Sequence, residues 1–123
     1  MNNPTDLQGW LDQISEQIID QDIEIVDPHH HLWPGPPRTE GAKAENHYLL
    51  EDLWKDTESG HKILKTVFIE CGQGYFKHGP EAMKPVGETK FVIEVADEAT
   101  LDISKAQIEG IVGHADMMLG NSA

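Results

Sequence analysis

Three consecutive histidines, His29 to His31, stand directly after a short apolar run and Asp27-Pro28. Residues two apart on an extended strand project to the same side, so the imidazoles of His29 and His31 can bind one ion through ring nitrogens at about 2.0–2.1 Å. His30 then points the other way. Asp27 shares the side of the histidine pair and is placed either to orient a ligand from the second shell of a metal site or to help bind the ion. The spacing therefore predicts a metal site with His29 and His31 as ligands.

Two imidazoles do not complete such a site, because a catalytic zinc ion usually has about three protein ligands and a water. The remaining ligands must come from elsewhere. A run of three histidines is also compatible with a polar surface turn or with part of an affinity tag, although tags are usually longer and terminal. The residues alone leave the metal site and the structural loop as alternatives.

Composition limits the class of protein. The chain has 123 residues, of which 38% are hydrophobic, and this matches one ordinary globular domain. Nine Lys and Arg against 22 Asp and Glu give a formal net charge of −13. Because this charge repels phosphate backbones and anionic bilayers, we predict that neither nucleic acid nor a membrane is a partner.

The first residues and the cysteine content indicate the cellular compartment. The start of the chain has no basic segment followed by an apolar one, and no apolar run approaches the roughly 18 residues that span a bilayer. The single cysteine, Cys71, cannot form an internal disulfide and fits a reducing compartment. We therefore predict a cytoplasmic protein.

The apolar pattern alternates between helical and strand-like stretches. Apolar residues at helical spacing predict helices over 5–20, from 49 to a stop at Gly60, and over 91–99. Short β-branched runs predict strands over 23–26, 66–69 and 108–112, and Pro and Gly predict a long loop over 34–46. Each expected strand is polar only after its last residue. Alternation of this kind predicts an α/β fold with a parallel sheet and right-handed crossovers.

Four segments of the chain resemble a known family of enzymes. The stretch from Asp27 to Trp33 resembles the signature Asp-x-His-x-His-x-Trp on the first strand of the amidohydrolase-related metal-dependent hydrolases, particularly the branch of sugar lactonases, dicarboxylic lactonases and related decarboxylases. Residues 66–71, 85–89 and 108–116 resemble the second strand, the entry to the second barrel helix and the third strand of that branch. The resemblance covers residues 23–123.

The fold implied by the resemblance is a (β/α)8 TIM barrel, which needs about 250 residues. The chain would then be the N-terminal portion of a barrel, about three β/α units, and would be truncated. Residues 1–22 would form an N-terminal helix and lead-in, and residues 23–123 a partial TIM-barrel domain. Later strands would carry the missing ligands and the general base, so the isolated chain is expected to be inactive.

The resemblance also assigns site residues. His29 and His31 match the ligands of a divalent metal ion, with zinc as the expected metal, and Trp33 matches the aromatic residue beside them. At the strand ends of a barrel, Glu70 and His114 would contact a substrate carboxylate or hydroxyl. The alternative is that both are solvated loop residues. Asp116 is expected to be a cap or turn residue, and Cys71 a buried small hydrophobic residue.

The implied function is a metal-dependent hydrolase that opens a lactone or a related small substrate, carboxylated or polyhydroxylated. Two alternatives stay open. One is a decarboxylase on the same scaffold. The other is a non-catalytic, truncated product that self-associates through unpaired strand edges.

Overall fold

The structure is a computed structural model that describes residues 7–35 and 47–122. The described helices are α1 (Leu7–Leu11), α2 (Leu50–Thr57) and α3 (Val86–Ala99), with 3-10 segments at Glu81–Met83 and Met117–Ser122. The strands are β1 (Glu24–His30), β2 (Trp33–Pro34), β3 (His47–Tyr48), β4 (Lys62–Ile69) and β5 (Gln107–Val112).

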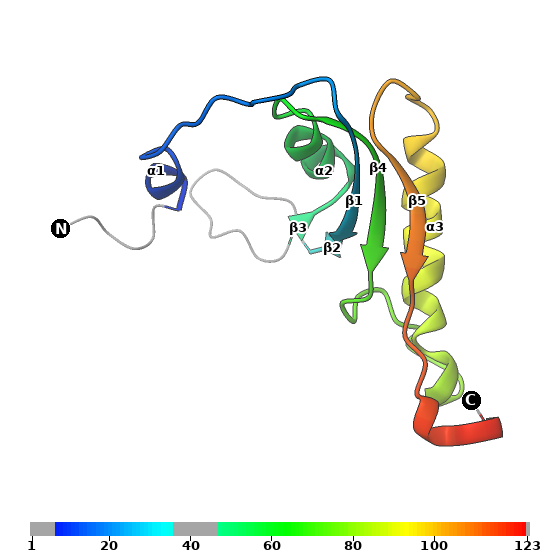
Figure 1. Cartoon of the computed structure of the whole chain (residues 1–123). Coiled ribbons are helices and arrows are strands. Elements are labelled where there is room, and N and C mark those ends of the chain that lie inside the picture. The colour runs from blue at the N-terminus through cyan, green and yellow to red at the C-terminus, as the bar shows by residue number, and fades with distance from the viewer. Residues whose placement is uncertain (1–6, 36–46, 123) are drawn as a thin grey trace.

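The central sheet is parallel, in the order β1-β4-β5. Figure 1 shows the three arrows side by side and pointing the same way, so their carboxyl ends meet at one edge. In the register between β1 and β4, Asp27 lies opposite Thr66 and His30 opposite Phe68, with an irregularity between these two pairs. The parallel pairing predicted from the alternation of elements is confirmed.

One buried cluster holds the sheet and the two longer helices together. Phe68 of β4 is fully buried at its centre, and so is Leu32, which follows β1. Helix α3 contributes side chains at positions three and four apart, the spacing of a single helix face. The buried apolar members of the cluster are Leu32, Leu50, Leu53, Phe68, Val92, Val95, Ala99 and Ile108. Helices α2 and α3 therefore share one face of the sheet.

The first crossover contains an element that the sequence pattern does not reveal. β2 and β3 pair antiparallel, with Trp33 opposite Tyr48 and Pro34 opposite His47. The Nδ1 atom of His47 lies 2.7 Å from the carbonyl oxygen of Gly35, which accepts the hydrogen bond. Most of the predicted loop over 34–46 lies outside the described residues. Its two flanks form a second, two-stranded sheet.

The prediction of a TIM-barrel portion is wrong. The described residues form a small α/β fold with a three-stranded parallel sheet, a two-stranded antiparallel sheet and three α-helices. Within the described residues the parallel sheet is open, with β1 and β5 as its edge strands. Parallel strands linked by helices occur in open sheets as well as in barrels, so the alternation of elements did not determine closure.

The prediction of a helix over 5–20 is correct only near its start. α1 ends at Leu11, and Trp10 and Ile14 of the predicted apolar stripe are 67% and 77% exposed. Figure 1 shows α1 apart from the central sheet. A short helix is marginal in water without a surface for its apolar stripe, which explains its early end. No helix in the described part of the chain is long and apolar enough to cross a membrane.

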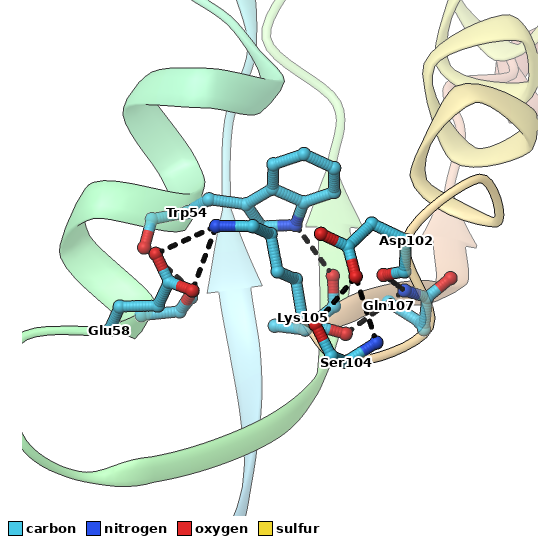
Figure 2. Close-up of polar contacts among 8 residues, drawn as sticks. Trp54, Glu58, Asp102, Ser104, Lys105 and Gln107 are labelled. Carbon is cyan, nitrogen blue, oxygen red and sulfur yellow. Dashed lines mark hydrogen bonds and ion pairs between the residues drawn. The ribbon is translucent and has the colours of Figure 1, made fainter.

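The amino-terminal edge of the sheet is closed by a polar network between α2 and the loop before β5 (Figure 2). The indole N–H of Trp54 donates to the carbonyl oxygen of Ala106 at 2.9 Å. The Lys105 ammonium pairs with Glu58 at 2.9 Å and lies 5.1 Å from the centre of the Trp54 ring. The Gln107 side-chain amide donates to the carbonyl oxygens of Asp102 and Lys105 in the same loop and of Ala99 at the end of α3. The network fixes the loop that leads into β5.

We expect Trp54→Phe to lower the free energy of unfolding by about 1–3 kcal/mol, because the carbonyl of the buried Ala106 loses its donor. Chemical denaturation followed by circular dichroism measures this. Trp10→Phe is the matched control, since Trp10 is 67% exposed and we expect little change there. Equal effects of the two substitutions would contradict the importance of this hydrogen bond.

Candidate functional site

Strand β1 runs through Pro28 and ends at His30, four residues beyond the predicted strand end at Val26. Proline removes a backbone donor, but β1 is an edge strand and tolerates that loss. The Asp27 carboxylate accepts the backbone N–H of His29 at 3.1 Å and so fixes the chain after the proline. The histidines therefore stand on an ordered strand end.

His30 points into the protein. It is 7% exposed, and its Nε2 atom lies 3.1 Å from the hydroxyl of Thr66 on β4. Its Nδ1 atom lies 3.4 Å from the carbonyl oxygen of His31, and its ring meets the ring of Phe68 edge-on. Burial lowers the pKa of His30 and favours its neutral form. His30 is a core residue that ties β1 to β4.

His29 and His31 converge on one point. Their Nε2 atoms are 3.3 Å apart, and their rings are nearly perpendicular with centroids at 4.9 Å. His31 is further held by Ile69, whose carbonyl oxygen lies 2.8 Å from Nδ1. A carbonyl oxygen only accepts, so Nδ1 of His31 carries a proton, and in the neutral ring the Nε2 lone pair is available to a ligand.

The donor set fits a zinc ion. Two nitrogens bound at about 2.0–2.1 Å in a tetrahedral arrangement lie about 3.3–3.4 Å apart. The observed 3.3 Å equals that separation. The contact from His31 to Ile69 is the backbone-carbonyl partner that metal-bound histidines usually have. Within residues 7–35 and 47–122, however, no group of three His, Cys, Asp or Glu is arranged to hold a metal ion.

A cavity of about 280 Å³ opens beside the histidine pair. Trp33, the predicted substrate contact, is one of its walls, with its ring 5.3 Å from the His31 ring. Tyr48 of β3 forms another wall, and its hydroxyl donates to the Asp56 carboxylate at 2.5 Å. Asp27 and Asp56 both line the cavity. The structure thus brings the predicted metal ligands, His29 and His31, together with Trp33.

The residues Tyr48 and Asp56 were not predicted as site residues. Burial, and then the hydrogen bond to Asp56 and the negative charge of nearby aspartates, raise the pKa of Tyr48 well above its usual value, so the phenol stays protonated. Asp56 lies one helical turn after Leu53, which is buried against the sheet. The helical spacing from Leu53 would have been enough to place Asp56 near β1. The position of Tyr48 depends on the pairing of β2 with β3, which was not predicted.

Glu70 and His114, the other predicted substrate contacts, form a separate pair. The Glu70 carboxylate lies 3.1 Å from Nδ1 of His114, and both side chains are about 40% exposed, at 38% and 42%. His114 lines a second cavity of about 320 Å³, together with Tyr75, Lys84 and Asp116, whereas His29, His31 and Trp33 line the first. Glu70 nevertheless follows Ile69 directly, the residue whose carbonyl holds His31.

The turn after β4 is anchored by a buried carboxylate. Glu88, in the first turn of α3, is 2% exposed and accepts the backbone N–H groups of Cys71 and Gln73. Burial, and then the charge of Glu88, raise the pKa of the Cys71 thiol, which contacts the carbonyl oxygen of Leu32 at 3.5 Å. Cys71 is therefore a thiol with a packing role.

Asp116 accepts the backbone N–H of Met118 in a turn.

Comparisons with known proteins show similarity to an uncharacterized protein and assign no family. No family model matches the chain, and no solved structure matches it. The "Uncharacterized protein y4mH" of Sinorhizobium fredii is 31% identical over 109 residues, which cover 77% of this chain and 32% of that protein. The chain therefore spans about a third of the length of this relative.

We expect Glu88→Ala to lower the free energy of unfolding by about 1–3 kcal/mol, because two backbone N–H groups in the turn after β4 lose their acceptor. Thermal and chemical denaturation measure the change. Glu94→Ala on the same helix is the control, because its carboxylate is 67% exposed and lies 4.0 Å from Lys90. A loss no larger than that of the control would exclude Glu88 as an anchor.

We expect the wild-type chain to bind one zinc or cobalt ion. His29→Ala, His31→Ala and the double variant should each weaken that binding about tenfold or more, since each removes a direct ligand. Isothermal titration calorimetry and the visible spectrum of the cobalt form measure affinity and stoichiometry. His61→Ala/His78→Ala removes two exposed histidines elsewhere and should bind the ion as the wild type does. Equal affinity in the two double variants would exclude the pair.

Proposed function

We propose that this chain carries the metal-binding part of a metal-dependent hydrolase that opens a lactone or a related small ester, as in the amidohydrolase-related hydrolases that its sequence resembles. One observation carries the proposal: the Nε2 atoms of His29 and His31 stand 3.3 Å apart at the end of β1. A divalent ion bound there would polarise a carbonyl and lower the pKa of a bound water.

The neighbouring residues prepare this pair for its role. The bond from Nδ1 of His31 to Ile69 presents the Nε2 lone pair outward. His30 keeps the strand end in place through Thr66 without adding a third exposed ring. Trp33 excludes water from one side of the cavity in which the substrate would lie. These contacts hold the ligands in position before any ion arrives, which lowers the entropic cost of binding it.

The site needs at least one more donor. Catalytic zinc sites usually have about three protein ligands, and the described residues offer two. We therefore expect the isolated chain to show no turnover. The third ligand and the general base would have to come from outside the described residues.

The non-catalytic alternative is also supported by an observation. Val26 and Val112, on the sheet face away from α2 and α3, are 55% and 48% exposed, and both β1 and β5 are edge strands. Apolar side chains and open strand edges of this kind favour association with another chain.

A decarboxylase would use the same pair of histidines, so it is distinguished by its products.

The test supplies the missing donor chemically. Zinc-loaded chain is incubated with a panel of lactones, with and without millimolar imidazole, and ring opening is followed by acid release. We expect no turnover without imidazole, and slow turnover with it, because imidazole provides a third nitrogen ligand. His29→Ala/His31→Ala should be inactive in both conditions.

Two outcomes would change the assignment. Release of carbon dioxide from a panel of aromatic acids, without ring opening of the lactones, would favour the decarboxylase. A rate with imidazole and zinc that is the same for the wild type and the double variant would exclude a hydrolytic role for the pair. His61→Ala/His78→Ala again serves as the control for general loss of histidine.

A further inference from the structure

His29 and His31 supply half of a closed tetrahedral shell for a metal ion. Their Nε2 atoms lie 3.3 Å apart, the separation of two nitrogen ligands on one zinc ion. A zinc ion in a structural site usually has about four protein ligands and no open position. Within the described residues, no third His, Cys, Asp or Glu is arranged to join the pair. The remaining positions on a bound ion must be filled from elsewhere.

The pair stands where another molecule can reach it. β1 is an edge strand, so no described strand of the parallel sheet lies beyond it. His29 is exposed and His31 is half-buried. Because Nδ1 of His31 is bonded to the carbonyl oxygen of Ile69 on β4, its Nε2 atom faces away from that strand. An ion held by the two Nε2 atoms is therefore accessible to ligands from a second molecule.

We propose that two copies of this chain share one zinc ion, to which each copy contributes His29 and His31. This inference rests on the metal-binding pair of the proposed function and adds a source for the missing ligands. A tetrahedron has two-fold axes that exchange its opposite edges. Two identical pairs related by such an axis therefore fill all positions of the ion with the same geometry on both sides. A second copy carries a pair of the required spacing, so no further partner is needed.

Charge makes the ion necessary for this association. Each chain has a formal net charge of −13, so two copies repel each other when no cation lies between them. Asp27 and Asp56 line the cavity beside the histidine pair, and no described lysine or arginine does. A divalent ion offsets this negative charge at the point of contact. We therefore expect a dimer only with the ion, whereas association through exposed apolar side chains or strand edges would need none.

The ratio of zinc to chain then selects between two states. When chains outnumber ions, two pairs share one ion, and no position is left for a water or a substrate. When ions are in excess, each pair can hold its own ion with open positions, which is the state that the proposed hydrolase requires. Imidazole at millimolar concentration acts in the same direction, because it competes for the positions that the second copy fills. The shared ion thus defines an inactive form of the protein.

The experiment measures molecular mass against metal content. The full chain is freed of metal with a chelator, zinc is added in steps, and analytical ultracentrifugation follows the mass. We expect a monomer without zinc, a dimer at about half an ion per chain, and a monomer again when the chelator is restored. Cobalt in place of zinc gives a second readout. At the same ratio its visible bands should be those of a tetrahedral site and should not change with azide, because no position is open.

His29→Ala/His31→Ala is the decisive variant, and we expect it to stay monomeric at every zinc concentration because it has no nitrogen to share. His29→Ala alone changes an exposed position and should also lose the dimer, which keeps the test available if the double variant does not fold. His61→Ala/His78→Ala retains the pair and should form the dimer as the wild type does. Circular dichroism of the metal-free variants reports whether each is folded.

Three results would overturn the inference. The first is a metal-free dimer that the double variant retains, and the second is a zinc-loaded chain that stays monomeric at the ratio of one ion to two chains. The third is a cobalt spectrum that azide shifts at that ratio, since it would reveal an open position.

Turnover on the same samples separates this inference from the proposed function. If zinc binds each chain through His29 and His31 and no dimer forms, only the sharing of the ion is wrong. If the zinc-dependent dimer forms and requires both residues, but imidazole elicits no ring opening of the lactones, the sharing holds and the hydrolase is excluded.

Discussion

The site depends on one hydrogen bond, between Nδ1 of His31 and the carbonyl oxygen of Ile69 at 2.8 Å. It joins the end of the edge strand β1 to the end of β4, and it decides which nitrogen of His31 carries the proton. The bond exists only in the observed register, in which His30 lies opposite Phe68. A slip of one residue would turn His30 outward and send His29 and His31 toward the opposite face, because side chains alternate along a strand.

The three histidines therefore divide into two roles by strand geometry. The middle ring is buried and neutral, and it bonds to Thr66. The outer two face each other across 3.3 Å. The buried ring contributes to the precision of the outer pair, because its contact with β4 fixes the strand from which both flanking residues project. A histidine pair on a free loop would lose more conformational entropy on binding an ion than this pair would.

Local patterns were enough to predict the elements that lie against the core. The stripes of α2 and α3 and the parallel strands follow from side-chain periodicity. The sequence was insufficient where a contact joins distant residues without a periodic signal. The two-residue strands β2 and β3, the pairing of Glu70 with His114 and the bond from Tyr48 to Asp56 are such contacts. Barrel closure was another, because open and closed parallel sheets share the same local pattern.

The two edges of the parallel sheet differ in how completely their polar groups are used. At the amino-terminal edge Gln107 donates to three carbonyls, and the indole N–H of Trp54 has its acceptor (Figure 2). At the carboxyl edge, the Nε2 atoms of His29 and His31 have only each other among the described residues. Polar groups whose hydrogen bonds are all made within the protein stabilise a loop and have none left for a ligand. Polar groups with an unused donor or acceptor contribute less to stability but can bind a ligand. The carboxyl ends of the strands are also where open α/β sheets bind their ligands. The unequal use of hydrogen bonds thus gives the amino-terminal edge a structural role, and it leaves unpaired donor atoms for a ligand at the carboxyl edge.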